Sequence, residues 1–150
     1  MTGDFMKKNV IISMRGTQLN DEAGLDLMEM MTEGKMYRKG GIYYLTYRES
    51  ETTGLEGTTT TIKIAAQEVA LIRFGTVNSQ FIFQLGKKHI SYYETPYGAF
   101  MIGITTNSAE IEMKDDGGYF NIGYGIEINN GAISFNQIQV LVRESGKIGG

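Results

Sequence analysis

The residues of this chain that could do chemistry are tyrosines, arginines and glutamates placed within strand-like sequence. A tyrosine offers a flat apolar ring and a hydroxyl that needs a hydrogen-bond partner when it is buried. If such side chains line the inside of a β-barrel, they form a mainly apolar cavity with a few polar groups that orient a ligand. The sequence therefore gives six candidate ligand-binding residues, which are Arg15, Tyr47, Arg73, Tyr92, Glu94 and Tyr97.

Three of these candidates are charged and lie in strand-like runs. An isolated buried charge is very costly, so a charged side chain inside the molecule needs a partner of opposite sign. Our hypothesis is that Arg15 and Arg73 point inward and either compensate Glu94 or bind an anionic ligand. An arginine whose guanidinium is exposed on the outer wall would be excluded from this role. The alternative is that these side chains fill the barrel with structural ion pairs, or cover its outer face.

Catalytic and metal sites have weaker support. His89 is the single histidine, and the nearest acid, Glu94, lies five residues further on and therefore on the opposite face of a strand. The chain has no cysteine, which excludes disulfides and thiolate chemistry, and no G-x-S-x-G turn of the kind that carries a nucleophilic serine. We predict no catalytic residue, no metal site and no cofactor.

Acidic residues gather at two places in the sequence. Glu49, Glu51 and Glu56 flank a turn, and Glu29 and Glu33 share one strand face if that strand is regular. Glycoside hydrolysis needs two carboxyl groups about 5–10 Å apart, a distance that the sequence does not fix. We interpret these residues as exposed loop acids.

The balance of charge limits the classes of partner. A net charge of −3 and a pI near 5.2 argue against a dedicated nucleic-acid binder, which would show a basic face. The first apolar run is only Val10, Ile11 and Ile12, whereas a secretory signal needs about 7–15 apolar residues and a spanning helix about 18 or more. We expect a soluble cytoplasmic protein with no nucleic-acid or membrane partner. A small-molecule ligand and a homodimer remain as alternatives.

Period-two alternation recurs along the whole chain and predicts an all-β fold. Val10, Ile12 and Met14 share one face of the first run, and glycine-rich turns at residues 39–41 and 115–118 predict hairpins. The predicted strands are residues 8–18, 25–38, 42–50, 58–61, 68–75, 79–85, 89–95, 97–106, 110–114, 120–128 and 133–143. In the last strand but one, the predicted apolar face is Phe120, Ile122, Tyr124, Ile126 and Ile128.

Two places predict irregular strands. The methionine-rich residues 25–36 have no clean period, so we expect a bulge at Gly34, with a helical turn as the alternative. Gly123 and Gly125 predict a bend or bulge of the kind found at barrel corners.

About ten strands joined by short turns match an antiparallel meander in a single domain, residues 1–150, with an ordered core of about 8–143. Closing the sheet into a barrel removes its edges completely. We therefore predict one up-and-down barrel of about 8–10 strands, with a two-sheet sandwich as the alternative.

Five sequence strings carry a family resemblance. They are RGTQ (residues 15–18), TEGK (32–35), TGLEGTTTT (53–61), IRFGTVNSQ (72–80) and HISYYETPYGAF (89–100). Together they resemble the YwiB-like family of small bacterial proteins, and the resemblance covers nearly the whole chain. It implies a calycin-like or lipocalin-like barrel. It implies no catalytic mechanism, and no functional residue is carried over from it.

The function that these observations favour is non-catalytic binding of a small, partly apolar ligand inside the barrel. An interaction or homodimer module with a filled barrel is the second alternative, and a hydrolase-type enzyme is the third.

Overall fold

Ten antiparallel strands form one continuous sheet in the structure, a computed structural model that describes residues 6–20 and 24–145. The strand order is β6-β5-β4-β3-β2-β1-β10-β9-β8-β7, so neighbours in the sheet are neighbours in the chain except where β1 meets β10. The elements are β1 (Met6–Asn20), β2 (Gly24–Lys39), β3 (Ile42–Arg48), the 3-10 turn η1 (Glu51–Thr53), β4 (Thr58–Ile64), β5 (Val69–Gly75), β6 (Ser79–Phe83), β7 (Lys88–Thr95), β8 (Gly98–Lys114), β9 (Gly117–Ile128) and β10 (Ile133–Glu144). The predicted all-β meander is confirmed.

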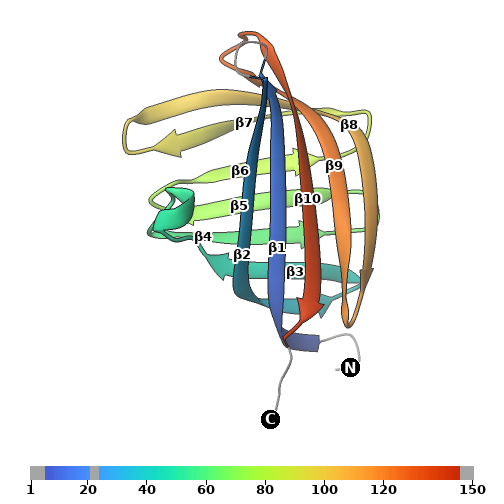
Figure 1. Ribbon diagram of the computed structural model, residues 1–150. Coiled ribbons are helices and arrows are strands. Elements are labelled where there is room, and N and C mark those ends of the chain that lie inside the picture. The colour runs from blue at the N-terminus through green and yellow to red at the C-terminus, as the bar shows by residue number, and fades with distance from the viewer. Residues whose placement is uncertain (1–5, 21–23, 146–150) are drawn as a thin grey trace.

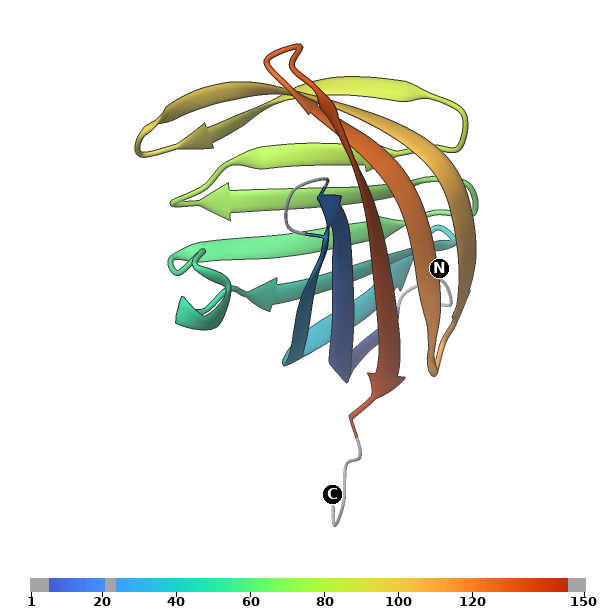
Figure 2. The same cartoon turned by 45° about the horizontal axis from the view of Figure 1, so that its top comes forward.

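The sheet wraps around itself as two crossing walls. In Figure 1, β1, β2, β9 and β10 run upright and cross in front of β3 to β7, which run across the view. Figure 2 shows how β8 connects the walls: it begins beside β7 and curves down to pair with β9. The inward faces of both walls supply the core.

Two isolated bridges bring the ends of the sheet together. The backbone N–H of Asn78 donates to the carbonyl of Glu94 at 3.0 Å, and the N–H of Glu94 donates back at 2.8 Å. Leu85 and Thr106 form a second, parallel bridge between the β6 end and β8. These bridges join the β6 end of the sheet to β7 and β8, so the barrel is nearly closed, as predicted.

The core follows the predicted alternation. Val10, Ile12 and Met14 are buried, as are Phe120 and Ile122. Fully burying an aliphatic or phenylalanine side chain contributes about 1.5–3 kcal/mol each, so this cluster dominates stability. The apolar face predicted for β9 included Ile128, but this residue is 51% exposed and does not belong to the core.

Gly34 is not the site of a bulge, and the helical alternative is wrong as well. β1 pairs with β2 without a register shift, from the partners Met6 and Arg38 at one end to the partners Asn20 and Gly24 at the other. Gly34 is instead a point of close approach, since a Cβ there would lie 2.7 Å from Ile12 Cδ1 and 2.8 Å from the Thr46 carbonyl oxygen. A glycine lets β2 and β3 meet at this distance.

The irregularity predicted near the β9 glycines falls on its partner strand. The register of β8 shifts between Thr106 and Ser108, opposite Tyr124 and Gly123. This bulge explains why the sequence predicted two strands, 97–106 and 110–114, where the structure has the single strand β8. The bulge bends the strand without ending it.

The β8–β9 turn is tied to β2 and β3. The Asp115 carboxylate accepts hydrogen bonds from the Tyr43 hydroxyl at 2.7 Å and from Arg38 Nη1. The Tyr43 bond, helped by the Arg38 bond and charge, holds the pKa of Asp115 below its ordinary value, against an opposing effect of burial that is second in size to the Tyr43 bond. The turn predicted at residues 115–118 is present, and it also fastens this corner of the barrel.

Candidate functional site

A row of polar side chains crosses the inside of the barrel on four adjacent strands. Tyr47 on β3 lies opposite Thr60 on β4, Thr60 lies opposite Arg73 on β5, and Arg73 lies opposite Ser79 on β6. Because facing residues of an antiparallel sheet point to the same side, the pairing brings all four together inside. Glu49 follows β3 and joins this row from the same face as Tyr47.

Glu49 is the most enclosed charge of the row. Its side chain is 2% exposed, and its carboxylate accepts hydrogen bonds from Thr53 Oγ1 at 2.8 Å and Thr60 Oγ1 at 2.5 Å. The prediction that Glu49 is an exposed loop acid is wrong. The chain stays extended beyond Arg48, so the alternation that places Tyr47 inside places Glu49 inside as well.

Arg73 compensates Glu49 and not Glu94. Its Nε lies 3.8 Å from Glu49 Oε2, which is an ion-pair distance but too long for a hydrogen bond. Among the described residues, Arg73 Nε and Ser79 Oγ are both buried without a hydrogen-bond partner. Thr106 Oγ1 on β8, opposite Tyr124, is in the same condition. Buried polar groups are nearly always satisfied, so this unused capacity needs an explanation.

Two tyrosines, the buried Tyr47 and the partly buried Tyr124, lie within the electrostatic reach of Arg73. Burial raises the pKa of the Tyr47 phenol above its ordinary value, and the Glu49 carboxylate raises it further, while Arg73 opposes the shift. Burial also raises the pKa of Tyr124, again with Arg73 acting in the opposite direction. Tyr124 packs edge-on against Phe83 with ring centroids 4.9 Å apart. Both phenols therefore stay protonated at neutral pH and act as polar contacts, not as proton carriers.

The structure brings together only two of the six predicted site residues, Tyr47 and Arg73. Arg15 lies on the outer wall, 53% exposed and paired with Glu29 at 3.2 Å, so the hypothesis that it points inward is wrong. Met14 occupies the inward position, and the alternation therefore turns Arg15 outward.

The three remaining candidates lie on or beside β7 and are exposed. Tyr92 and Glu94 face outward, because Ser91 and Tyr93 take the inward positions of the strand. Tyr97, at 95% exposure, is in the β7–β8 turn. The expected inward placement of these three is thus wrong.

His89, the single histidine, contacts Gln84, with His89 Nε2 3.2 Å from Gln84 Oε1. In the part of the chain that the structure describes, no group of three or more metal-ligating acids and histidines is found. The same residues contain no helix long and apolar enough to cross a membrane.

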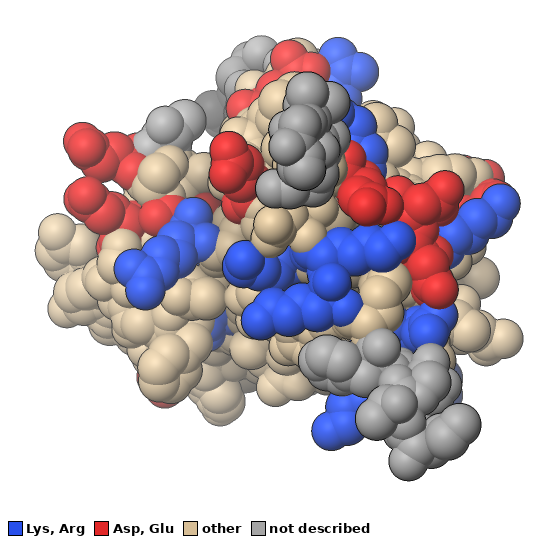
Figure 3. Space-filling view, turned by 90° about the horizontal axis from the view of Figure 1, so that it is seen from below, with Lys and Arg blue, Asp and Glu red and all other residues tan. Residues whose placement is uncertain are grey.

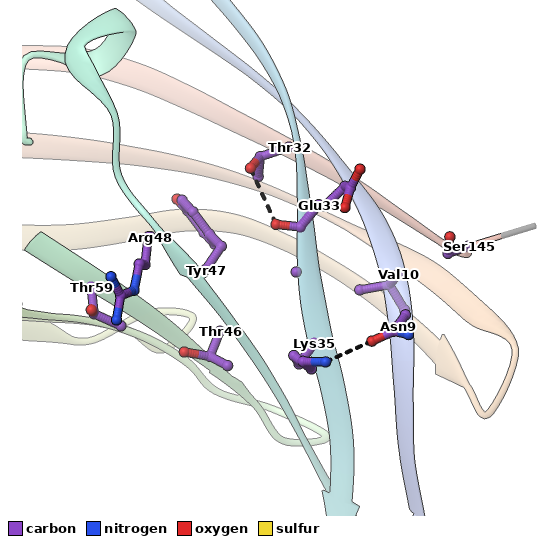
Figure 4. Close-up of a pocket in the computed structure, with 11 residues that line it drawn as sticks. Asn9, Val10, Thr32, Glu33, Lys35, Thr46, Tyr47, Arg48, Thr59 and Ser145 are labelled. Carbon is purple, nitrogen blue, oxygen red and sulfur yellow. Dashed lines mark hydrogen bonds between the residues drawn. The ribbon is translucent and has the colours of Figure 1, made fainter.

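A groove of about 860 Å³ opens on the surface beside Tyr47. Figure 4 shows it between two walls, with Thr46, Arg48 and Thr59 on one side and residues of β1 and β2 on the other. The groove lies where β3 separates from β2, just beyond the close contact at Gly34. The sequence does not reveal this groove, because the groove depends on where two strands diverge.

The fold and site define a class: a nearly closed ten-stranded antiparallel barrel with a charged and phenolic row inside. The chain belongs to the family described as "Domain of unknown function (DUF1934)", which matches residues 12–140. A similar protein is the "Uncharacterized beta-barrel protein YwiB" of Bacillus subtilis (strain 168), 25% identical over 112 residues that cover 75% of this chain and 78% of the relative.

The crystal structure of the ywiB protein from Bacillus subtilis has a similar fold. It superposes with a TM-score of 0.83 at 20% sequence identity, covering 96% of this chain and 97% of that one. The resemblance noted in the sequence strings is therefore confirmed, and so is the barrel.

Proposed function

We propose that this protein is a non-catalytic binding protein that takes up a small, partly apolar ligand inside the barrel. The single observation that supports this most strongly is the facing pair of Arg73 and Ser79. Arg73 Nε and Ser79 Oγ are both buried, neither has a hydrogen-bond partner among the described residues, and the two residues are direct partners on β5 and β6. A ligand oxygen placed between them would accept two hydrogen bonds, one of them charge-assisted.

The surroundings of the pair favour a ligand with an apolar body. The rings of Tyr47 and Tyr124 lie near the Arg73 charge, and Phe83 packs against Tyr124. Small-molecule sites are generally lined by such rings with a few polar groups that fix orientation. Glu49 already balances the arginine charge, so a carboxylate or a carbonyl oxygen with an aromatic or aliphatic tail fits best.

The arrangement supports binding better than catalysis. Both Glu49 carboxylate oxygens are engaged by threonine hydroxyls, and the raised pKa values keep the two phenols neutral. A general base must be free to take a proton at its operating pH. The two neutral phenols do not meet that condition.

The test is calorimetric titration with octanoate, benzoate and benzaldehyde against the wild type and Ser79→Ala. We expect at least one of these probes to bind, and Ser79→Ala to weaken it about fivefold, the loss of one hydrogen bond of about 1 kcal/mol. The variant removes a hydroxyl that no described residue uses, so its melting temperature should not fall. Ser13→Ala, on the outer face of β1, is the matched control. Probe binding that is equal in all three proteins would contradict the proposal.

A second candidate function is self-association through the outer wall. Leu19 and Phe135 are direct partners on β1 and β10, each 55% exposed, and Leu27 on β2 is 52% exposed. Exposed apolar side chains that gather on one face often mark protein contacts. Light scattering over a concentration series tests this: a mass that stays monomeric at all concentrations would exclude it.

A further inference from the structure

One edge of β2 is left without a partner. β2 pairs with β1 along its whole length. It pairs with β3 only over residues 35–39, where Lys35 lies opposite Thr46 and Lys39 lies opposite Ile42. Within the described part of the chain, residues 24–34 have no strand beside them on the side away from β1. Backbone N–H and C=O groups on such an edge can pair with another extended chain. The groove of about 860 Å³ lies where this free edge begins.

Positively charged side chains lie on both walls of the groove. In Figure 4, Arg48 lies beside Thr59 on one wall and Lys35 lies on the opposite wall. Lys35 Nζ donates to Asn9 Oδ1 at 2.9 Å, which fixes the position of its charge. Glu33 also lines the groove and is its one acidic side chain. The groove thus has a net positive charge of one.

The outer face around the groove is more strongly basic. Five cations on the outward positions of β1 to β4 have no ion-pair partner among the described residues: Lys7, Lys35, Lys39, Arg48 and Lys63. On these positions Glu33 is the one described carboxylate outside an ion pair. Figure 3 shows Lys and Arg gathered across the middle of this side of the molecule, with acidic residues at its margins. A chain with a net charge of −3 therefore carries one cationic face.

We propose that the groove docks an extended acidic polypeptide segment, which adds as a strand to the free edge of β2. The charge of the face selects an anionic partner, and the free edge selects one with a peptide backbone. Side chains on one face of an added strand recur about every 6.6 Å, so acidic residues at the end of the segment that enters the groove would point at Lys35 and Arg48. A nucleic acid offers the charge but cannot continue a β-ladder.

The experiment is fluorescence anisotropy with a labelled peptide of alternating glutamate and valine, titrated with the full chain. We expect the double variant Lys35→Glu/Arg48→Glu to weaken binding by about tenfold or more, because two attractive charges become repulsive. The matched control is Lys87→Glu/Lys114→Glu, which reverses two exposed cations away from the groove and should leave binding unchanged. Binding that is equal in both double variants would overturn the proposal.

Three further probes separate charge from strand addition. Peptides N-methylated at alternate residues should fall into two sets, one that binds normally and one that does not, because alternate N–H groups of an added strand face the edge. Two sets with equal affinity would contradict strand addition. Oligothymidylate and tripolyphosphate should compete weakly. If either binds more tightly than the acidic peptide, the occupant is a phosphate polymer and the proposal is wrong.

Discussion

The barrel contains two clusters of the same composition, an arginine, an acid and a tyrosine, and they differ in whether the arginine hydrogen-bonds to the acid and in how deeply the acid is buried. At the β8–β9 turn, Arg38 and Tyr43 both bond to Asp115. Inside the barrel, Arg73 reaches Glu49 only at ion-pair distance. Asp115 is half exposed, whereas the Glu49 side chain is almost completely buried.

The two clusters therefore differ in role: the one at Asp115 holds a turn in place, and the one at Glu49 is the candidate binding site. Direct bonds to a half-exposed carboxylate hold a turn in place. The buried Nε of Arg73 has no hydrogen-bond partner among the described residues, and each such unmet group costs about 1–3 kcal/mol. Such a cost is expected where the unmet groups are used by a ligand. The interior cluster is therefore the one to test for binding.

The largest expected effect comes from removing the buried acid. Glu49→Ala would leave the Arg73 charge uncompensated and the buried Thr60 hydroxyl without its acceptor. Breaking a buried ion pair from one side typically costs about 3–5 kcal/mol. Urea unfolding should show a loss of this size, and the exposed Glu51→Ala should change stability by less than about 0.5 kcal/mol.

The double variant Glu49→Leu/Arg73→Met sharpens this result. Apolar side chains of similar volume can replace a buried ion pair at little cost. We expect it to recover most of the stability lost in Glu49→Ala while losing the binding of octanoate or benzoate. If it is as unstable as the single variant, the pair is structural and the distinction between the two clusters fails.

A smaller effect is expected at Gly34, beside the interior cluster. A Cβ at Gly34 would press on Ile12 and on the Thr46 carbonyl, and would lie 3.4 Å from Tyr47 Cβ. Gly34→Ala should therefore cost about 1–3 kcal/mol. The matched control is Gly16→Ala, where the nearest atom would be 4.0 Å away. Equal urea midpoints for the two variants would show that β2 and β3 are not in close contact.

The smallest effect is the pH dependence of the Asp115 fastening. Its folded pKa lies below the ordinary value of 3.8, so its contribution is complete above that pH and is lost as the pH falls through the folded pKa. Wild type should be more stable than Asp115→Asn at neutral pH, and the two urea midpoints should converge well below pH 3.8. A difference that persists in strong acid would show that the carboxylate charge is not responsible.

The parts of the fold that could be predicted are those set by local alternation. Val10, Ile12 and Met14 face inward because apolar and polar side chains alternate around them, and the barrel follows from many short hairpins. Tyr47 and Arg73 were predicted as site residues because each is polar within a strand. Glu49 was missed, although it lies two residues beyond Tyr47 in the predicted strand 42–50, because it was grouped with Glu51 and Glu56 as an exposed acid beside a turn.

The parts that could not be predicted depend on which way each strand faces. Arg15, Tyr92 and Glu94 lie on outward positions, and one undetected shift of register would have reversed them. The groove beside Arg48 depends on the point where β2 and β3 separate, which is fixed by packing at Gly34 and by the twist of two walls. No single-strand pattern contains that information.

The most direct test of the binding account is the nuclear magnetic resonance signal of the Arg73 Nε–Hε group. We predict that titration with octanoate or benzoate shifts this resonance and protects its proton from exchange, while the Arg38 Nε–Hε resonance does not move. The shift should weaken in Ser79→Ala. A bound probe that leaves the Arg73 resonance unchanged would contradict the account.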